Sequence, residues 1–293
     1  MRMSVFCLAL SMVLQMPWAS QAGENASFST ARTAEYATKT VGGWAICEST
    51  NFRFCCRGRT TASHATVAAA EALKSKLALK WLGEDAQADD IADWRPKCDV
   101  ILHTSLASYL QAAPGGEQTI GSSLIEVERG QILTRRIDIR ADRAGWFTGA
   151  LGHELTHVVL ADVFPNGNVP HWADEGMAVL ADTQTKQSAH FRDLRIAQSS
   201  RSTLRLVELM ALEGYPRPHQ QAAFYGQSAS IVRFLVERNT PERFVSFVRS
   251  AAKSGYEQAL RDDYQINGIQ ELELRWARYV QREATRSNVA ASE

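Results

Sequence analysis

Two histidines and a glutamate are spaced as metal chemistry on a helix requires. His153 and His157 stand four residues apart in the segment HELTH, so on an α-helix their imidazole rings share one face and can bind a single ion. Glu154 projects about 100° further round such a helix. It can therefore reach a water molecule beside the metal as a general base without binding the metal itself.

The residues around HELTH favour a metal site over a chance match. The chain has 7 histidines in 293 residues, and this pattern is expected by chance in roughly one chain in a hundred of such composition. Apolar residues flank the two histidines, among them Leu151, Leu155 and Val158, which predicts a helix that runs through the core. Buried imidazoles need polar partners, and one metal ion would satisfy both. The alternative is a core helix whose histidines bind separate carbonyl groups.

A catalytic zinc site needs a third protein ligand and an open position. Pro165 ends the first helix, and the segment PNGNVP then predicts a turn. A second helix that starts near His171 would bring Glu175 back towards the first helix, and Gly176 beside it allows a close approach. Glu175 is therefore the predicted third ligand, with Asp174 and His171 as the alternatives.

Two aspartates are candidates for hydrogen bonds to the metal-binding side chains. Asp182 follows Glu175 by seven residues and so lies on the same face of a helix. Asp162 follows His157 by five residues, which places it roughly 140° round the helix and makes it the weaker candidate. Either aspartate could instead belong to a solvated helix face.

These segments together resemble a known group of enzymes. HELTH followed by WADEGMA is similar to the gluzincin metallopeptidases, and more narrowly to the bacterial peptidase MA-like domains. The later segment AFYGQSASIVRFLVER also resembles the helix that follows the metal site in that group. The similarity covers residues 145–280. The resemblance implies an α+β, zincin-like fold, with a mixed twisted sheet and an active-site helix followed by a mainly helical C-terminal part.

The resemblance also implies a cofactor and a reaction. One Zn²⁺ ion would be bound by three ligands, His153, His157 and Glu175. Glu154 would be the general base in the hydrolysis of peptide bonds by zinc-activated water, and the substrate would be a polypeptide. Tyr225 matches a tyrosine that could stabilise the oxyanion, and its alternative role is a core or cleft-wall aromatic. The chain has no G-x-M-E-N-type stretch before the metal helix, so we expect an endopeptidase rather than an aminopeptidase.

The first 22 residues have the composition of a secretory signal peptide. An arginine gives a positive start, Ser4 to Leu14 is almost wholly apolar, and small residues flank Gln21. The apolar run is shorter than the roughly 20 residues that a membrane-spanning helix needs. We therefore expect cleavage after Ala22, with Ala19 or Ser20 as the alternative site. The mature protein would be secreted or periplasmic and would have no stable membrane anchor.

Four cysteines follow the predicted signal peptide, namely Cys47, Cys55, Cys56 and Cys98. An even number in an exported chain predicts two disulfide bonds. Cys55 and Cys56 are adjacent and poorly placed to bridge each other. The possible pairings are Cys47–Cys55 with Cys56–Cys98, or Cys47–Cys56 with Cys55–Cys98. A zinc–thiolate site is the alternative, although the chain lacks a C-x-x-C motif.

The remaining sequence divides into two halves. Residues 23–40 lack apolar periodicity and are expected to form a flexible arm. Residues 41–145 combine predicted strands, such as CDVILHTS and ILTRRIDIR, with a predicted helix over residues 65–82. Residues 146–285 contain the metal-site helix and further helical segments, and residues 286–293 are expected to be a frayed tail.

The overall composition limits the kinds of partner. The 32 basic and 32 acidic side chains give a net charge of zero, so neither nucleic acid nor an anionic membrane is expected as a partner. A hydrophobic content of 45% is enough for a buried core. Two alternatives to a peptidase stay open: a catalytically inactive binding domain of zincin fold, and a metallohydrolase of non-peptide amides such as cell-wall cross-links.

Overall fold

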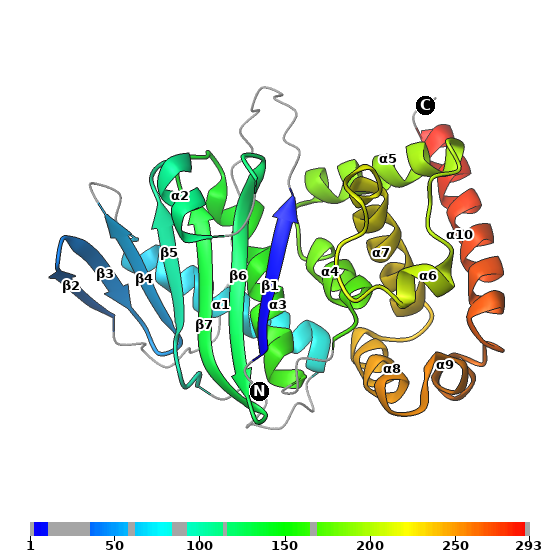
Figure 1. Cartoon of the computed structure of the whole chain (residues 1–293), viewed down its shortest axis with the longest axis horizontal. Helices are drawn as coiled ribbons and strands as arrows, with labels where there is room; N and C mark the ends of the chain where they lie inside the picture. Colours follow the sequence, from blue (N-terminus) through cyan, green and yellow to red (C-terminus); the bar gives the residue numbers. More distant parts are fainter. Residues whose placement is uncertain are drawn as a thin grey trace.

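A mixed sheet forms the N-terminal half of the molecule, and helices form the C-terminal half (Figure 1). The computed structural model describes residues 3–10, 36–57, 62–83, 93–113, 116–164 and 169–290. This arrangement confirms the predicted α+β class, with the mixed sheet preceding a mainly helical part.

The sheet has seven strands in the order β1-β6-β7-β5-β4-β3-β2. The strands are β1 (Met3–Leu10), β2 (Ala37–Val41), β3 (Trp44–Glu48), β4 (Phe52–Arg57), β5 (Cys98–His103), β6 (Thr119–Glu128) and β7 (Gln131–Arg140). The pairs β4–β5 and β5–β7 are parallel, and the other neighbours are antiparallel. Because side chains alternate along a strand, Phe52 and Phe54 of β4 and Ile137 of β7 are buried on the face that α1 and α3 cover.

The helix predicted over residues 65–82 is α1 (His64–Leu82), and it packs against the sheet. The hydroxyl of Ser63 accepts a hydrogen bond from the backbone N–H of Thr66, which satisfies one free donor at the start of the helix. Gly83 ends the helix with a φ of 79°, a conformation that glycine adopts without strain. The short helix α2 (Leu106–Ala112) follows β5.

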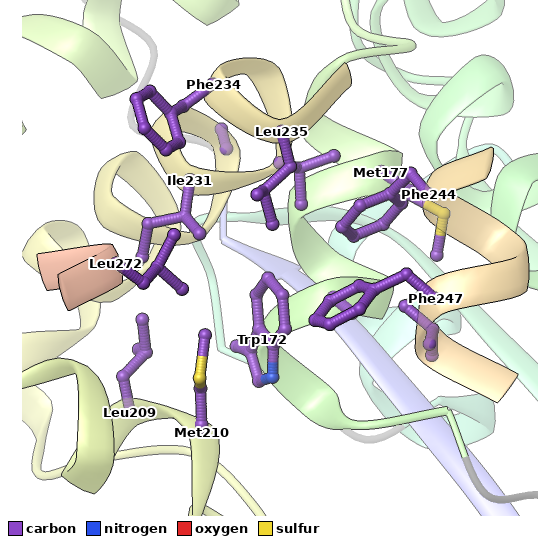
Figure 2. Close-up of a cluster of buried hydrophobic side chains, with 14 of the residues drawn as sticks. Trp172, Met177, Leu209, Met210, Ile231, Phe234, Leu235, Phe244, Phe247 and Leu272 are labelled. Carbon is purple, nitrogen blue, oxygen red and sulfur yellow. The ribbon is translucent and has the colours of Figure 1, made fainter. Parts of the chain in front are cut away.

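A run of helices follows β7. After the π-helical turn Phe147–Leu151 come α3 (Gly152–Val163), α4 (His171–Val179), α5 (Gln184–Ser199), α6 (Leu206–Met210), the 3-10 turn Pro218–Gln220, α7 (Gln221–Val236), α8 (Pro241–Ser254), α9 (Tyr256–Tyr264) and α10 (Ile269–Ala290). Figure 2 shows Trp172 of α4 within their shared core, beside Phe244 and Phe247 of α8. The indole N–H of Trp172 donates to the Tyr256 hydroxyl at 2.9 Å, so this buried ring also has its polar partner.

Helix α3 joins the two halves of the molecule. Leu151, just before it, and Leu155 and Val158 within it, pack in the core under the sheet, whereas Leu160 and Val163 pack in the core of the helical half. Both cores therefore hold the helix that carries HELTH, and its orientation is determined by packing on two sides.

In the whole chain, the N-terminal segment forms a strand of the sheet. Residues Met3–Leu10, predicted as part of a signal peptide, form β1 and pair antiparallel with β6, with Ala9 opposite Gly121. Residues 11–35 lie outside the described residues, so cleavage after Ala22 stays a prediction. The predicted flexible arm is wrong from residue 37 onwards, because Ala37–Val41 forms β2 by pairing with β3. No helix in the described ranges is long and apolar enough to span a membrane.

Helix α10 differs from the expected frayed tail. It continues to Ala290, and only residues 291–293 of the predicted tail lie outside the described part of the chain.

The predicted disulfide bonds are wrong, because all four cysteines are free thiols. Cys47 lies opposite Phe54 and therefore shares the core face of the sheet with Cys56 and Cys98. Cys55 lies between Phe54 and Cys56 on β4, so it points to the other face. Each proposed pairing includes Cys55 and would join opposite faces of one sheet. Burial raises the pKa of the Cys55 thiol to about 11 and also raises the pKa of Cys98.

A glycine in α7 allows its close contact with α5. A Cβ atom at Gly226 would lie 2.3 Å from the carbonyl oxygen of His190. We expect Gly226→Ala to lower the free energy of unfolding by about 1–3 kcal/mol, because the two backbones must move apart. Urea unfolding measures this change. Gly149→Ala is the matched control, since a Cβ there meets open space, and equal stability of the two variants would contradict the prediction.

Candidate metal centre

Three side chains that the sequence places on two predicted helices meet at one point. His153 and His157 extend from α3 and Glu175 extends from α4, and one ligand atom from each lies within 4.8 Å of the other two. His153 Nε2 is 3.4 Å from Glu175 Oε2. The three side chains are at most 3% exposed. The structure therefore brings together the three residues that the sequence analysis named as ligands.

Close packing of α4 against α7 sets the position of Glu175. A Cβ atom at Gly176 would lie 2.4 Å from Val232 Cγ2 and 2.7 Å from the carbonyl oxygen of Ser228, both in α7. Glycine is therefore needed at this position for the two helices to approach as they do. The neighbouring Glu175 is carried to α3 by the same helix.

The two alternative third ligands have other contacts. Asp174 Oδ1 lies 2.9 Å from His157 Nδ1, so Asp174 orients a histidine and is not a member of the three-residue group. The His171 ring lies edge-on to Tyr215, with ring centroids 4.3 Å apart, and stacks on Phe224. His171 thus forms part of the aromatic wall beside the centre.

Each histidine of the group has a carboxylate at its Nδ1 atom. Asp174 occupies this place for His157, and Asp182 Oδ2 lies 3.2 Å from His153 Nδ1. Lys186 Nζ donates to Asp182 Oδ1 at 2.6 Å, which holds that carboxylate in turn. A carboxylate at Nδ1 fixes the ring orientation and turns Nε2 towards the metal position.

Asp162, the weaker candidate, has a different role. Its carboxylate binds the guanidinium of Arg135 and accepts a hydrogen bond from Trp94 Nε1 at 2.6 Å. These contacts join the end of α3 to the sheet, away from the two histidines.

The polar atoms at the centre fit a bound cation. His153 Nε2, His157 Nε2 and Glu175 Oε2 are buried and have no hydrogen-bond partner among the described residues. Buried polar atoms normally have partners, so three orphaned acceptors that face one another call for a shared positive charge. Two imidazole nitrogens and one carboxylate oxygen form a donor set that zinc prefers.

The charges around the centre are strongly coupled. Burial disfavours the charged form of His153, but the carboxylate of Asp182 outweighs it and raises the pKa of His153 to about 10. Burial likewise opposes ionisation of Glu175, yet the adjacent imidazole of His153 and the nearby charge of His157 lower its pKa. The residues around the metal position therefore hold Glu175 as a carboxylate, the form that binds a metal.

Glu154 has the surroundings of a proton acceptor. Its side chain is fully buried, and neither carboxylate oxygen has a hydrogen-bond partner among the described residues. Burial raises the pKa of Glu154 to about 7, against the opposing charges of His153 and His157. Strand β6 closes the site on one side, because a Cβ atom at Gly121 would lie 2.9 Å from Glu154 Oε1. A carboxyl group with a pKa near neutrality can both accept and return a proton.

One tyrosine contacts the centre and a second lies beside the first, and the sequence analysis named only the second. The Tyr215 hydroxyl donates to Glu175 Oε1 at 2.7 Å, which leaves Oε2 facing His153. Tyr225, from α7, is buried beside Tyr215, with ring centroids 6.3 Å apart. The oxyanion role of Tyr225 stays a prediction. Tyr215 lies in the irregular segment between α6 and the turn Pro218–Gln220, where no periodicity could identify it.

A family model describes this part of the chain. The model of the Peptidase MA superfamily matches residues 129–282, which is more than half of the 293 residues. The chain belongs to the Peptidase MA superfamily. The Peptidase MA match begins in the β6–β7 hairpin and includes α3, α4 and α7, so it contains the whole candidate metal centre. Membership in Peptidase MA and the preformed centre support a metallopeptidase in general.

The chain also matches parts of two solved structures with longer chains. Two structures of a variant M1 zinc metallopeptidase from Deinococcus radiodurans match with 13% and 15% identity and TM-scores of 0.36 and 0.37. The matches cover 83% of this Peptidase MA chain but only 52% and 51% of the other chains. This chain thus spans about half the length of those structures. The second of them is bound to a Tyr-Ser-Ala substrate. No curated protein sequence matches the chain.

The hydroxyl of Tyr215 provides a test of how Glu175 is held. We expect Tyr215→Phe to weaken zinc binding about 10–100-fold, because a carboxylate ligand loses the hydrogen bond that orients it. Competition with a chelating dye measures the affinity. Tyr256→Phe is the matched control, since that hydroxyl binds Trp172 and not the metal ligands. Equal zinc affinity of the Tyr215 variant and the wild type would show that this hydrogen bond does not position Glu175.

Proposed function

We propose that the protein is a secreted or periplasmic zinc-dependent endopeptidase that hydrolyses polypeptides, with Glu154 as the general base. The observation that carries the proposal is the buried group His153, His157 and Glu175 beside Glu154, whose carboxylate has no hydrogen-bond partner in the described part of the chain. One bound zinc ion would polarise the scissile carbonyl group and lower the pKa of a water molecule. The composition of the first 22 residues supports export.

Residues of the protein transfer the proton and position the metal ligands. Glu154 takes a proton from the attacking water and gives it to the leaving amine, which a pKa raised to about 7 by burial allows. Asp174 and Asp182 keep the two histidines in position, and Tyr215 does the same for Glu175. None of these steps needs a covalent bond between enzyme and substrate.

The edge of β6 supports a polypeptide substrate. In the whole chain, β6 pairs with the extended segment Met3–Leu10. A peptide can bind to a sheet in the same way, through main-chain hydrogen bonds to a strand. Ala9 of that segment lies opposite Gly121, and Gly121 is in contact distance of Glu154. After removal of Met3–Leu10 with the predicted signal peptide, an extended substrate in its place on β6 would pass directly beside the general base. Main-chain recognition of this kind requires a peptide backbone and favours it over other amides.

The direct test compares the wild type with Glu154→Gln. Bound zinc is measured on the purified protein, and cleavage is measured on an unfolded protein and on peptidoglycan fragments. We expect one zinc ion per chain in both proteins and a loss of protein cleavage of about 10²–10⁴-fold in the variant, because the proton acceptor is removed. The proposal fails if the wild type holds no stoichiometric zinc or if both proteins cleave equally fast. Preferential cleavage of the peptidoglycan fragments would replace the proposed substrate.

A second prediction concerns the strand beside the base. We expect Gly121→Ala to reduce kcat by at least about tenfold while zinc content is kept, because the new methyl group displaces the Glu154 carboxylate. Gly214→Ala is the matched control, since a Cβ there meets open space. Steady-state kinetics and metal analysis measure the two quantities. Unchanged kcat in the Gly121 variant would mean that Glu154 does not act from the position described.

A further inference from the structure

A serine, a histidine and an aspartate form a hydrogen-bonded chain outside the metal centre. His103 lies at the end of β5, Asp138 lies in β7, and Ser108 lies in α2, which packs against both strands (Figure 1). Leu102 and Ile137 directly precede the first two and are buried in the core under the sheet. Because side chains alternate along a strand, the histidine and the aspartate point to the opposite face. None of the three residues belongs to the metal-binding group.

The three side chains have the spacing of a nucleophile, its base and the group that orients the base. Ser108 Oγ is 2.9 Å from His103 Nδ1, and His103 Nε2 is 2.7 Å from Asp138 Oδ1. Arg136 donates to both oxygens of Asp138 at 2.8 Å, which fixes that carboxylate. A hydroxyl within about 2.6–3.2 Å of a base that a third group orients is the structural signature of an activated nucleophile.

The hydrogen bonds determine where the protons lie. A carboxylate only accepts hydrogen bonds, so His103 Nε2 carries the proton that it donates to Asp138. In the neutral imidazole ring, Nδ1 is then the acceptor of the hydrogen bond that the Ser108 hydroxyl donates. The imidazole is thus in the tautomer that can remove the proton from the serine, and the carboxylate stabilises the imidazolium that forms.

The base is shielded from water, whereas the nucleophile is accessible. His103 and Asp138 are each 4% exposed, and the ring of Tyr109 packs edge-on against the imidazole, with ring centroids 5.6 Å apart. Ser108 is exposed on α2. An acyl donor in solvent can therefore approach Ser108, while the hydrogen bonds behind it lie in a less polar environment, where they are stronger.

We propose that Ser108 is a nucleophile that accepts an acyl group from an activated carboxylic ester, with His103 as its base. The Ser108 oxygen bonds to the acyl carbon, and the bond from that carbon to the oxygen of the leaving alcohol breaks. The hydroxyl proton passes to His103 Nδ1 and from there to the leaving alcohol oxygen. The products are an acylated serine and a free alcohol. The site is defined by its own residues and does not depend on the proposed peptidase activity.

The test exposes the full chain with its metal to p-nitrophenyl acetate. Samples are quenched with acid at successive times, and peptide mass spectrometry follows the acetylation of individual serines. Ser199 is the internal control, because it is also exposed and helical, but its hydroxyl donates to the carbonyl oxygen of Arg195 and not to an imidazole. We expect acetylation of Ser108 to be at least about 10²-fold faster than that of Ser199, since assistance by a general base is worth about 10²–10⁴-fold.

Variants test the role of the base. His103→Gln should reduce the rate at Ser108 to that of the control serine, because glutamine cannot take up the proton. His64→Gln is the matched control and should leave the rate unchanged, since the imidazole of His64 contacts the hydroxyl of Thr38. If His103→Gln does not fold, as judged by circular dichroism, Asp138→Asn takes its place. This second variant should reduce the rate at least about tenfold, because an amide has no charge to stabilise the imidazolium.

Two results would overturn the proposal. One is acetylation of Ser108 no faster than that of Ser199 in the wild type, a comparison that needs no variant. The other is an unchanged rate at Ser108 in a folded variant that lacks the base or its carboxylate, which would show that these hydrogen bonds only attach α2 to the sheet. Glu154→Gln tests the proposed function alone and should leave the acetylation of Ser108 unchanged, so the two proposals fail separately.

Discussion

The centre of this protein depends on the balance of several charged groups that are buried within one pair of helices. His153, His157, Glu154 and Glu175 are each at most 3% exposed, and Asp182 is buried behind them. Groups of this kind are costly to remove from water unless opposite charges and hydrogen bonds compensate them. Each histidine accordingly has a carboxylate at Nδ1, and Lys186 compensates Asp182. Within the described part of the chain, the ligand atoms of His153, His157 and Glu175 that have no hydrogen-bond partner lie within 4.8 Å of one another.

The fold keeps these groups buried by packing α3 into two cores. Its first half contributes to the core under the sheet, and its last turn contributes to the core of the helical half. Helix α4 is then fixed to α7 at Gly176, where the two helices leave no room for a side chain. The packing of α3 thus fixes the two histidines, and the packing of α4 fixes Glu175. The three side chains therefore meet with little conformational freedom.

The parts of the centre that follow from local periodicity could be predicted from the sequence. HELTH gives two imidazoles and a base through the geometry of one helix turn, and the turn predicted from the segment PNGNVP made Glu175 a reasonable third ligand. The sequence could name Asp174 as a residue near the metal site but could not pair it with His157. Asp174 and Glu175 are adjacent on α4, and the direction of each side chain decides which one binds the metal and which one orients a histidine. Tyr215 could not be found, since its contact with Glu175 spans 40 residues and an irregular segment. The disulfide prediction failed because the count of cysteines carries no information about which face of β4 each one occupies.

The orphaned atoms at the centre also have a consequence for folding. A chain without a metal must bury Glu154, Glu175 and two histidines with their mutual charges only partly balanced. A cation that binds the folded chain and not the unfolded chain adds its binding free energy to the free energy of unfolding. Helix α3 contributes to both cores, so this gain is shared by the sheet and the helical half. Metal supply would then set how long the molecule survives unfolding and proteolysis, as well as whether it can act.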